Sequence, residues 1–239
     1  MLTKVVASDA AGAARSCAQR VLELLTKAVA DNGRATLAVS GGSTPKPMFA
    51  DLAKSGFNWK AVHLFFVDER VVPPTDEQSN YKLALDNFIG PSGIPLENVH
   101  RVKGELPPDS AARQYDADLR AYFGLQRGQF PAFDVMHFGM GDEGHTASLF
   151  PGDPHVDDRK RLTGAVNAPK LPNLRVTLLP GVLLTARHSL MLVAGADKNP
   201  ILKRALHGEY NPIEIPVQIV AQACSGVEWF LDTAAADGL

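Results

Sequence analysis

"FDVMHFGMGDEGH", residues 133–145, places a short apolar run directly in front of a polar loop that contains three glycines. Apolar runs that do not alternate with polar residues are typical of strands covered on both faces. The glycines give the following loop backbone freedom, and two carboxylates and a histidine give it charge. The stretch therefore predicts a buried strand that carries a polar loop to the edge of a sheet.

The same order of apolar run, polar loop and helical pattern recurs along the chain. Apolar runs begin at residues 35, 62 and 189, and polar loops with Gly, Asp or Lys follow them. Helical patterns come next, and Thr44 is expected to cap a helix whose first residue is Pro45. The expected helices lie at 14–32, before Gly33 as a stop signal, and at 44–53, 79–88, 146–150 and 200–208.

Strands covered on both faces and joined by helices predict an α/β fold. We expect a Rossmann-like, open and mostly parallel sheet with helices on both faces. No Gly/Ser or Pro linker divides the sequence, so a single domain over residues 1–239 is the economical interpretation.

Composition narrows the function classes. The 239 residues are 45% hydrophobic and 21% charged, as in ordinary globular proteins, and the net charge is −2. The Lys and Arg residues are scattered along the sequence, so we expect no cationic patch that would bind nucleic acid or an anionic membrane. The N-terminal stretch has no apolar signal region, no run approaches the roughly 20 apolar residues of a membrane span, and the two cysteines lack zinc-site spacing. We expect a cytoplasmic monomer without a metal site.

Four of the expected strands end in polar loops, and these loops should meet. In open parallel sheets, ligands bind beyond the carboxyl ends of the strands. The sequence therefore predicts one binding site at that edge. The loops are residues 40–45, 68–70, 139–145 and 195–199.

The first loop, "SGGSTP", has the residues of an anion cradle. Two glycines permit exposed backbone N–H groups, hydroxyls flank them, and a helix N-terminus follows. A Gly-Ser turn with a helix cap is the equal alternative. The loop lacks the GK[ST] ending and the GxGxxG spacing of nucleotide sites. The candidate anion-binding residues are Ser40, Gly41, Gly42, Ser43 and Thr44.

The second and third loops carry titratable groups. Asp68 and Arg70 alternate, so an extended backbone would turn both to one side, although a solvated ion pair is the simpler interpretation. The spacing around His145 is not HExxH, which disfavours a metal. Acid/base use of His145 fits better than an ordinary hydrogen-bonded loop histidine.

Two further cations stand near expected strand ends. A surface arginine and a helix-start lysine are the alternatives for Arg175 and Lys198. A lysine at a helix N-terminus opposes the helix dipole, which favours a functional interpretation of Lys198.

Five segments in one order resemble a known family. They are "SGGSTP", "DERVVPPTDEQSNYKLA", "FDVMHFGMGDEGHTASLFPG", "RVTL" and "GADKNPILKRAL", which fall between residues 40 and 206. The sequence resembles the 6-phosphogluconolactonases, within the group that includes the glucosamine-6-phosphate deaminases. The resemblance implies hydrolysis of the δ-lactone of 6-phosphogluconate, the second step of the oxidative pentose phosphate pathway, without metal or organic cofactor.

The resemblance also implies roles. His145 would be the general base toward water, a role that suits the ordinary pKa of histidine. Arg70 would stabilise the oxyanion, with Asp68 holding it in place, although the matching Asp in the deaminases is an acid/base group. The phosphate would bind loop 40–44, with Arg175 and Lys198 as cationic partners.

One position departs from the family pattern. That pattern has Gly-x-Asp-Gly-His, whereas this sequence has Glu143 in place of the Asp. We expect Glu143 to orient or electrostatically support His145, and Asp142 is the alternative carboxylate.

Two other functions compete with the lactonase. A glucosamine-6-phosphate deaminase is the nearest, and "HTASLFPG" favours the lactonase over it. A non-catalytic sugar-phosphate sensor is the other, and the presence of His145 argues for catalysis instead.

Overall fold

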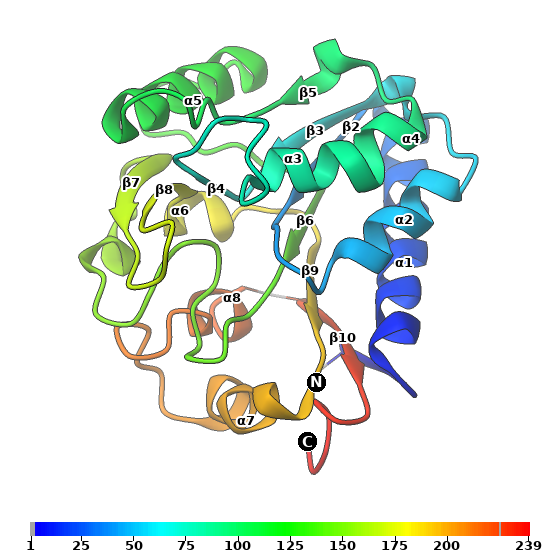
Figure 1. Ribbon diagram of the computed structural model, residues 1–239, viewed down its shortest axis with the longest axis vertical. Coiled ribbons are helices and arrows are strands. Elements are labelled where there is room, and N and C mark those ends of the chain that lie inside the picture. Colours follow the sequence, from blue (N-terminus) through cyan, green and yellow to red (C-terminus); the bar gives the residue numbers. More distant parts are fainter. Residues whose placement is uncertain (1–2, 225) are drawn as a thin grey trace.

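A seven-stranded, fully parallel sheet forms the centre of the computed structural model, which describes residues 3–224 and 226–239. The strand order is β1-β10-β9-β6-β2-β3-β5 (Figure 1). The inner strands β2, β6 and β9 are buried at every residue, as the unbroken apolar runs predict. The strands are β1 (Thr3–Ala7), β2 (Ala35–Val39), β3 (Val62–Phe66), β5 (Val99–His100), β6 (Val135–Phe138), β9 (Ser189–Val193) and β10 (Glu228–Asp232).

Helices cover both faces of this sheet and create two apolar cores (Figure 1). One core lies under α1 (Ala10–Asn32) and α2 (Lys46–Lys54), and the other lies under α5 (Pro108–Phe123) and α7 (Asn199–His207). The shorter helical segments are η1 (Trp59–Ala61), α3 (Asn80–Ala84), η2 (Leu85–Ile89), α4 (Gly90–Ser92), η3 (Leu96–Asn98), η4 (Pro154–Asp157), α6 (Pro180–Leu183), η5 (Ala196–Lys198) and α8 (Gln218–Ala221).

Helix α1 shows how the sequence sets these layers. Apolar residues recur every three or four positions from Ala13 to Ala28 and form a buried face, and Leu22 at its edge is partly buried. Asp9 accepts a hydrogen bond from the Gly12 N–H at the N-terminus, and Gly33 ends the helix in the left-handed conformation at φ 74°. The helix therefore has the predicted face and the predicted stop.

A small antiparallel sheet lies beside the parallel one. Its order is β4-β8-β7, from β4 (Asp68–Arg70), β8 (Leu174–Leu178) and β7 (Thr163–Asn167). Only Val67 separates β3 from β4, so the chain passes directly from one sheet into the other. In the register, Arg70 pairs with Arg175. The sequence did not predict this second sheet. Two of its strands, β4 and β8, carry the candidate site residues Asp68, Arg70 and Arg175.

The α/β prediction is confirmed, and two local predictions are wrong. Residues 146–150 form a turn with a Thr146–Leu149 bridge instead of a helix, because Ser148 is held by Asp68 and by the Thr177 hydroxyl. Helix α2 begins at Lys46, and Thr44 makes no capping hydrogen bond. Among the described residues, no helix has the length and apolar character that a membrane span requires. The single-domain interpretation stays a prediction.

Candidate active site

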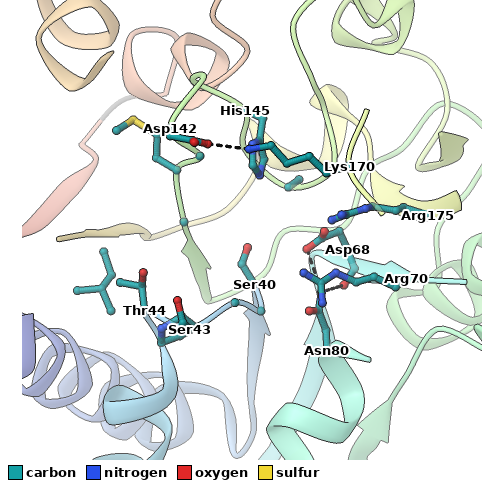
Figure 2. Close-up of a pocket in the computed structure, with 18 of the residues that line it drawn as sticks. Ser40, Ser43, Thr44, Asp68, Arg70, Asn80, Asp142, His145, Lys170 and Arg175 are labelled. Atoms are coloured by element: carbon teal, nitrogen blue, oxygen red, sulfur yellow. Dashed lines mark hydrogen bonds and ion pairs between the residues drawn. The ribbon is translucent and has the colours of Figure 1, made fainter. Parts of the chain in front are cut away.

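The carboxyl ends of β2, β6 and β9 meet β4 and β8 around a pocket of about 360 Å³ (Figure 2). All the predicted site residues except Glu143 line it. They are Ser40, Gly41, Gly42, Ser43, Thr44, Asp68, Arg70, His145, Arg175 and Lys198. The four loops therefore meet at one edge, as the sequence predicts, and the antiparallel sheet that it did not predict supplies a further wall.

The 40–45 loop forms one wall of the pocket, in front of α2 (Figure 2). Gly42 has φ 103°, a conformation that L side chains rarely adopt. At Gly41 a Cβ atom would lie 1.9 Å from Asn80 Oδ1, so only glycine permits this close approach. Both glycines are therefore required by the backbone path, which turns the Ser43 and Thr44 side chains toward the pocket.

Asp68 is a buried carboxylate that is held on both sides. Its Oδ2 accepts a hydrogen bond of 2.6 Å from the Ser148 hydroxyl. Asn80 Nδ2 donates to the Asp68 carbonyl at 2.9 Å and to Oδ1 at 3.4 Å. No salt bridge joins Asp68 to Arg70 in the described part of the chain. The expectation that Asp68 holds Arg70 directly is therefore not supported by this geometry.

Glu69 does that positioning instead. Its buried carboxylate accepts bonds of 2.7 Å from the backbone N–H groups of Arg70, Asn80 and Tyr81, and one of 3.0 Å from the Ser79 hydroxyl. Burial raises the pKa of Glu69, and these donors oppose the shift. These contacts hold β4 against α3. In the sequence, Glu69 is the middle charged residue of "DER", and strand alternation turns it to the side opposite Asp68 and Arg70, which could have identified it.

The pocket also has a wall of two guanidinium groups. Arg70 and Arg175 pair in the antiparallel register, so their side chains leave the same face (Figure 2). Arg175 Nε donates to the Pro172 carbonyl at 3.0 Å, and its guanidinium carbon lies 5.6 Å from the Phe150 ring centroid. Burial lowers the pKa of Arg175, and Asp68 opposes that shift. Two neighbouring cations favour the binding of an anion in the space between this wall and the opposite wall of the pocket.

His145 and Glu143 form a hydrogen-bonded pair. The distance from His145 Nδ1 to Glu143 Oε2 is 2.9 Å, and the imidazole stacks on Phe150 at 4.4 Å between ring centroids. This contact with His145 is the main reason that the pKa of Glu143 lies well below its usual range. A proton on Nδ1 facing the carboxylate leaves Nε2 as the acceptor.

Lys170 is a pocket residue that the sequence did not reveal. Its Nζ lies 2.8 Å from Asp142 Oδ1 (Figure 2). The distance from Nζ to Glu143 Oε1 is 2.9 Å. These two carboxylates raise the pKa of Lys170, with Asp142 the larger cause. Asp142 is largely exposed and has Lys170 as its partner, so Glu143 is the carboxylate that contacts His145.

Lys198 completes the lining from η5, next to the N-terminus of α7. Its side chain is mostly buried and lies 3.5 Å from Asp197. Within residues 3–224 and 226–239, no group of three His, Cys, Asp or Glu side chains is placed to hold a metal ion.

Comparisons with known proteins agree on one family. The family model for glucosamine-6-phosphate isomerases/6-phosphogluconolactonase matches residues 8–229. A 6-phosphogluconolactonase of Synechocystis sp. is 36% identical over 216 residues, which cover 90% of this chain and 89% of that protein. The structure of 6-phosphogluconolactonase from Trypanosoma cruzi is similar at a TM-score of 0.90 and 25% identity, covering 100% of this chain and 97% of that one. A monomeric glucosamine-6-phosphate deaminase shares the fold at a TM-score of 0.82 and 16% identity, covering 98% of this chain and 99% of that one.

The glycine at position 141 is predicted to be required by the His145–Glu143 pair. A Cβ atom there would lie 2.0 Å from His145 Nδ1 and 2.4 Å from Glu143 Oε2. Gly141→Ala should therefore separate the pair and lower the kcat of a reaction that uses His145 by roughly 10²-fold. Gly139→Ala is the matched control, because its Cβ would meet nothing within 4 Å. Equal kcat values for the two variants would show that the close approach has no catalytic importance.

Proposed function

The chain belongs to the glucosamine-6-phosphate isomerase/6-phosphogluconolactonase family, and from this membership we propose that it hydrolyses 6-phospho-D-glucono-1,5-lactone to 6-phosphogluconate. The observation that carries the proposal is the His145–Glu143 pair at the pocket, in which Nδ1 faces the carboxylate. In the tautomer that donates to this carboxylate, Nε2 is free to accept a proton. An imidazole held in this way accepts a proton from water. The reaction needs no cofactor.

The proposed reaction proceeds in two steps. His145 Nε2 removes a proton from water as the water oxygen bonds to the lactone carbonyl carbon, and the carbonyl oxygen becomes an oxyanion. The oxyanion then reforms the carbonyl, the bond to the ring oxygen breaks, and the imidazolium returns its proton to that oxygen. Ionised Glu143 stabilises the imidazolium between the steps, and Arg70 stabilises the oxyanion.

Asp68 has a supporting place in this scheme. Its carboxylate is held by Ser148 and Asn80, at the pocket edge and near Arg175. A fixed negative charge there balances part of the charge of the cations on β4 and β8 without a direct contact to Arg70. We assign Asp68 to this electrostatic role.

The phosphate group is proposed to bind loop 40–44, with Lys198 and Arg175 as cationic partners. Backbone N–H groups before the N-terminus of α2 and the hydroxyls of Ser43 and Thr44 are suitable donors. Arg175 pairs with Arg70 in the β4–β8 register, which supports a role for Arg175 both toward the phosphate and toward the group that Arg70 contacts. The cationic walls fit a substrate with an anionic end.

The deaminase and the sensor domain remain the competing functions. The deaminase fold likeness at 16% identity does not distinguish the reactions, whereas relatives above 30% identity carry the lactonase name. Two free cysteines fit a reducing compartment, and we propose action as a cytoplasmic monomer.

The activity and its base can be tested together. Fresh 6-phosphogluconolactone should be hydrolysed well above its spontaneous rate, while glucosamine 6-phosphate should release no ammonia. His145→Ala should keep its melting temperature and lose about 10²–10⁴-fold in kcat, because proton transfer is lost. Ammonia release without lactone hydrolysis would overturn the assignment, and a His145→Ala kcat within threefold of wild type would remove the general-base role.

Glu143 is predicted to support the imidazolium that forms at His145 during the reaction. Its carboxylate lies 2.9 Å from His145 Nδ1, where a negative charge stabilises that cation. Glu143→Gln should therefore lower kcat, because the imidazolium loses its charged partner. Glu143→Asp should stay within about tenfold, a barrier change of roughly 1.4 kcal/mol.

Lys170→Met is the control for the charge around this carboxylate. It leaves the Glu143–His145 contact in place, and Lys170 is half exposed, so kcat should fall less than in Glu143→Gln. A Glu143→Gln kcat equal to that of the wild type would make the carboxylate a bystander.

Substitution of the two proposed phosphate partners should affect KM and kcat differently. Lys198→Ala should mainly raise KM, because a phosphate contact persists from the ground state to the transition state. Arg175→Ala should raise KM and also lower kcat, because Arg175 lies beside Arg70. Competition by the product 6-phosphogluconate measures the binding part. If 6-phosphogluconate competes as strongly in both variants as in the wild type, the phosphate site has been assigned to the wrong residues.

A further inference from the structure

His137 is a buried pocket residue that the mechanism above does not use. It ends the apolar run of β6, is 1% exposed and lines the pocket. Neither ring nitrogen has a hydrogen-bond partner in the described part of the chain. The hydroxyl of Ser40, 5% exposed and also part of the lining, has no partner among the described residues either.

The two residues belong to one corner of the pocket. The Ser40 N–H donates to the His137 carbonyl at 3.2 Å, and the β2–β6 register pairs Val39 with His137. Ser40 is the first residue of the 40–45 loop. Because β6 lies between β2 and β9, His137 stands between that loop and the segment that carries Lys198.

A histidine at this position is costly to the free protein. Residues on the same face of the neighbouring strands, Val39 and Leu190, are apolar and buried. Burial of polar atoms without partners destabilises the folded state, and an apolar side chain of similar size would avoid that cost. A bound group that supplies the missing hydrogen-bond partner would offset this cost.

The imidazole is suited to donate to an anion without adding charge. Desolvation lowers the pKa of His137 to about 3, so the ring is neutral and has one N–H donor. We propose that His137 and the Ser40 hydroxyl donate hydrogen bonds to a phosphoryl oxygen of the substrate, between loop 40–45 and Lys198. The inference rests on the proposed function for the identity of that substrate. It adds a binding residue beyond the loop and the two cations.

Replacement by leucine tests this inference through two opposite effects. His137→Leu removes the unpaired polar atoms, so the melting temperature of the free protein should rise by at least about 2 °C. The Kd for 6-phosphogluconate in calorimetry should weaken by about tenfold or more, because a hydrogen bond to a charged group is lost. The Kd for unphosphorylated gluconate should change less than threefold.

Three further measurements separate binding from structure. His137→Gln retains an N–H donor and should recover part of the affinity. His188→Leu, directly before β9 and outside the pocket lining, is the matched control and should leave the Kd unchanged. In phosphorus NMR, the bound 6-phosphogluconate should take up its second phosphate proton at higher pH in His137→Leu, since a donor favours the dianion.

The outcomes are distinct. A wild-type Kd in His137→Leu would overturn the inference, and so would a lower melting temperature with equal losses for gluconate and 6-phosphogluconate, which indicates a structural role. Absence of lactone hydrolysis by the wild type, with 6-phosphogluconate binding that still depends on His137, would reject the proposed function and leave this inference standing. Hydrolysis by the wild type together with unaltered binding in His137→Leu would support the proposed function and reject this inference.

Discussion

The carboxylate of Glu69 is the contact on which the arrangement of the site depends. It is buried, and it accepts hydrogen bonds from three backbone N–H groups and one hydroxyl of β4 and α3. A buried charge is tolerated only when its lone pairs are satisfied in this way, so the contact requires β4 and the start of α3 to keep one geometry. That geometry places Asp68, Arg70 and Asn80 at the pocket. The position of the candidate oxyanion-stabilising arginine therefore follows from a carboxylate that faces away from the substrate.

The parallel sheet and the antiparallel sheet contribute different parts of the chemistry. Loops at the ends of β2, β6 and β9 bring backbone donors and the His145–Glu143 pair, because glycines at 41 and 141 allow close approaches that any Cβ atom would block. The antiparallel pairing of β4 with β8 brings the guanidinium groups together from residues far apart in the sequence. The placement of the two arginines thus depends on pairing within the antiparallel sheet, and proton transfer depends on one loop of the parallel sheet. A change in the packing of β8 would disturb the first more than the second.

The sequence predicted the parts that depend on local pattern. Apolar runs gave the buried strands, and the polar loops behind them met at one edge, as the geometry of a parallel sheet requires. The antiparallel sheet, the turn at 146–150 and the pocket residues Asn80 and Lys170 were missed. Each depends on contacts between distant segments: Ser148 with Asp68, Asn80 with Asp68, and Lys170 with Glu143. Periodicity within a segment carries no information about such partners, which explains both the successful and the wrong predictions.

The two histidines of the "FDVMHFGMGDEGH" stretch differ in how well each agrees with the sequence pattern around it. His145 lies on a loop, where a polar side chain is expected, and its Nδ1 has a carboxylate partner. His137 lies in a strand, where every neighbouring position is apolar, and its ring has no partner among the described residues. Natural sequences usually agree with their structures at every level, and sites that serve a ligand are the common exceptions. A buried polar group that lowers the stability of the free protein is retained when it acts in the bound state. The motif therefore identified the partnered histidine, and only the structure identified the unpartnered one as a second group for the ligand.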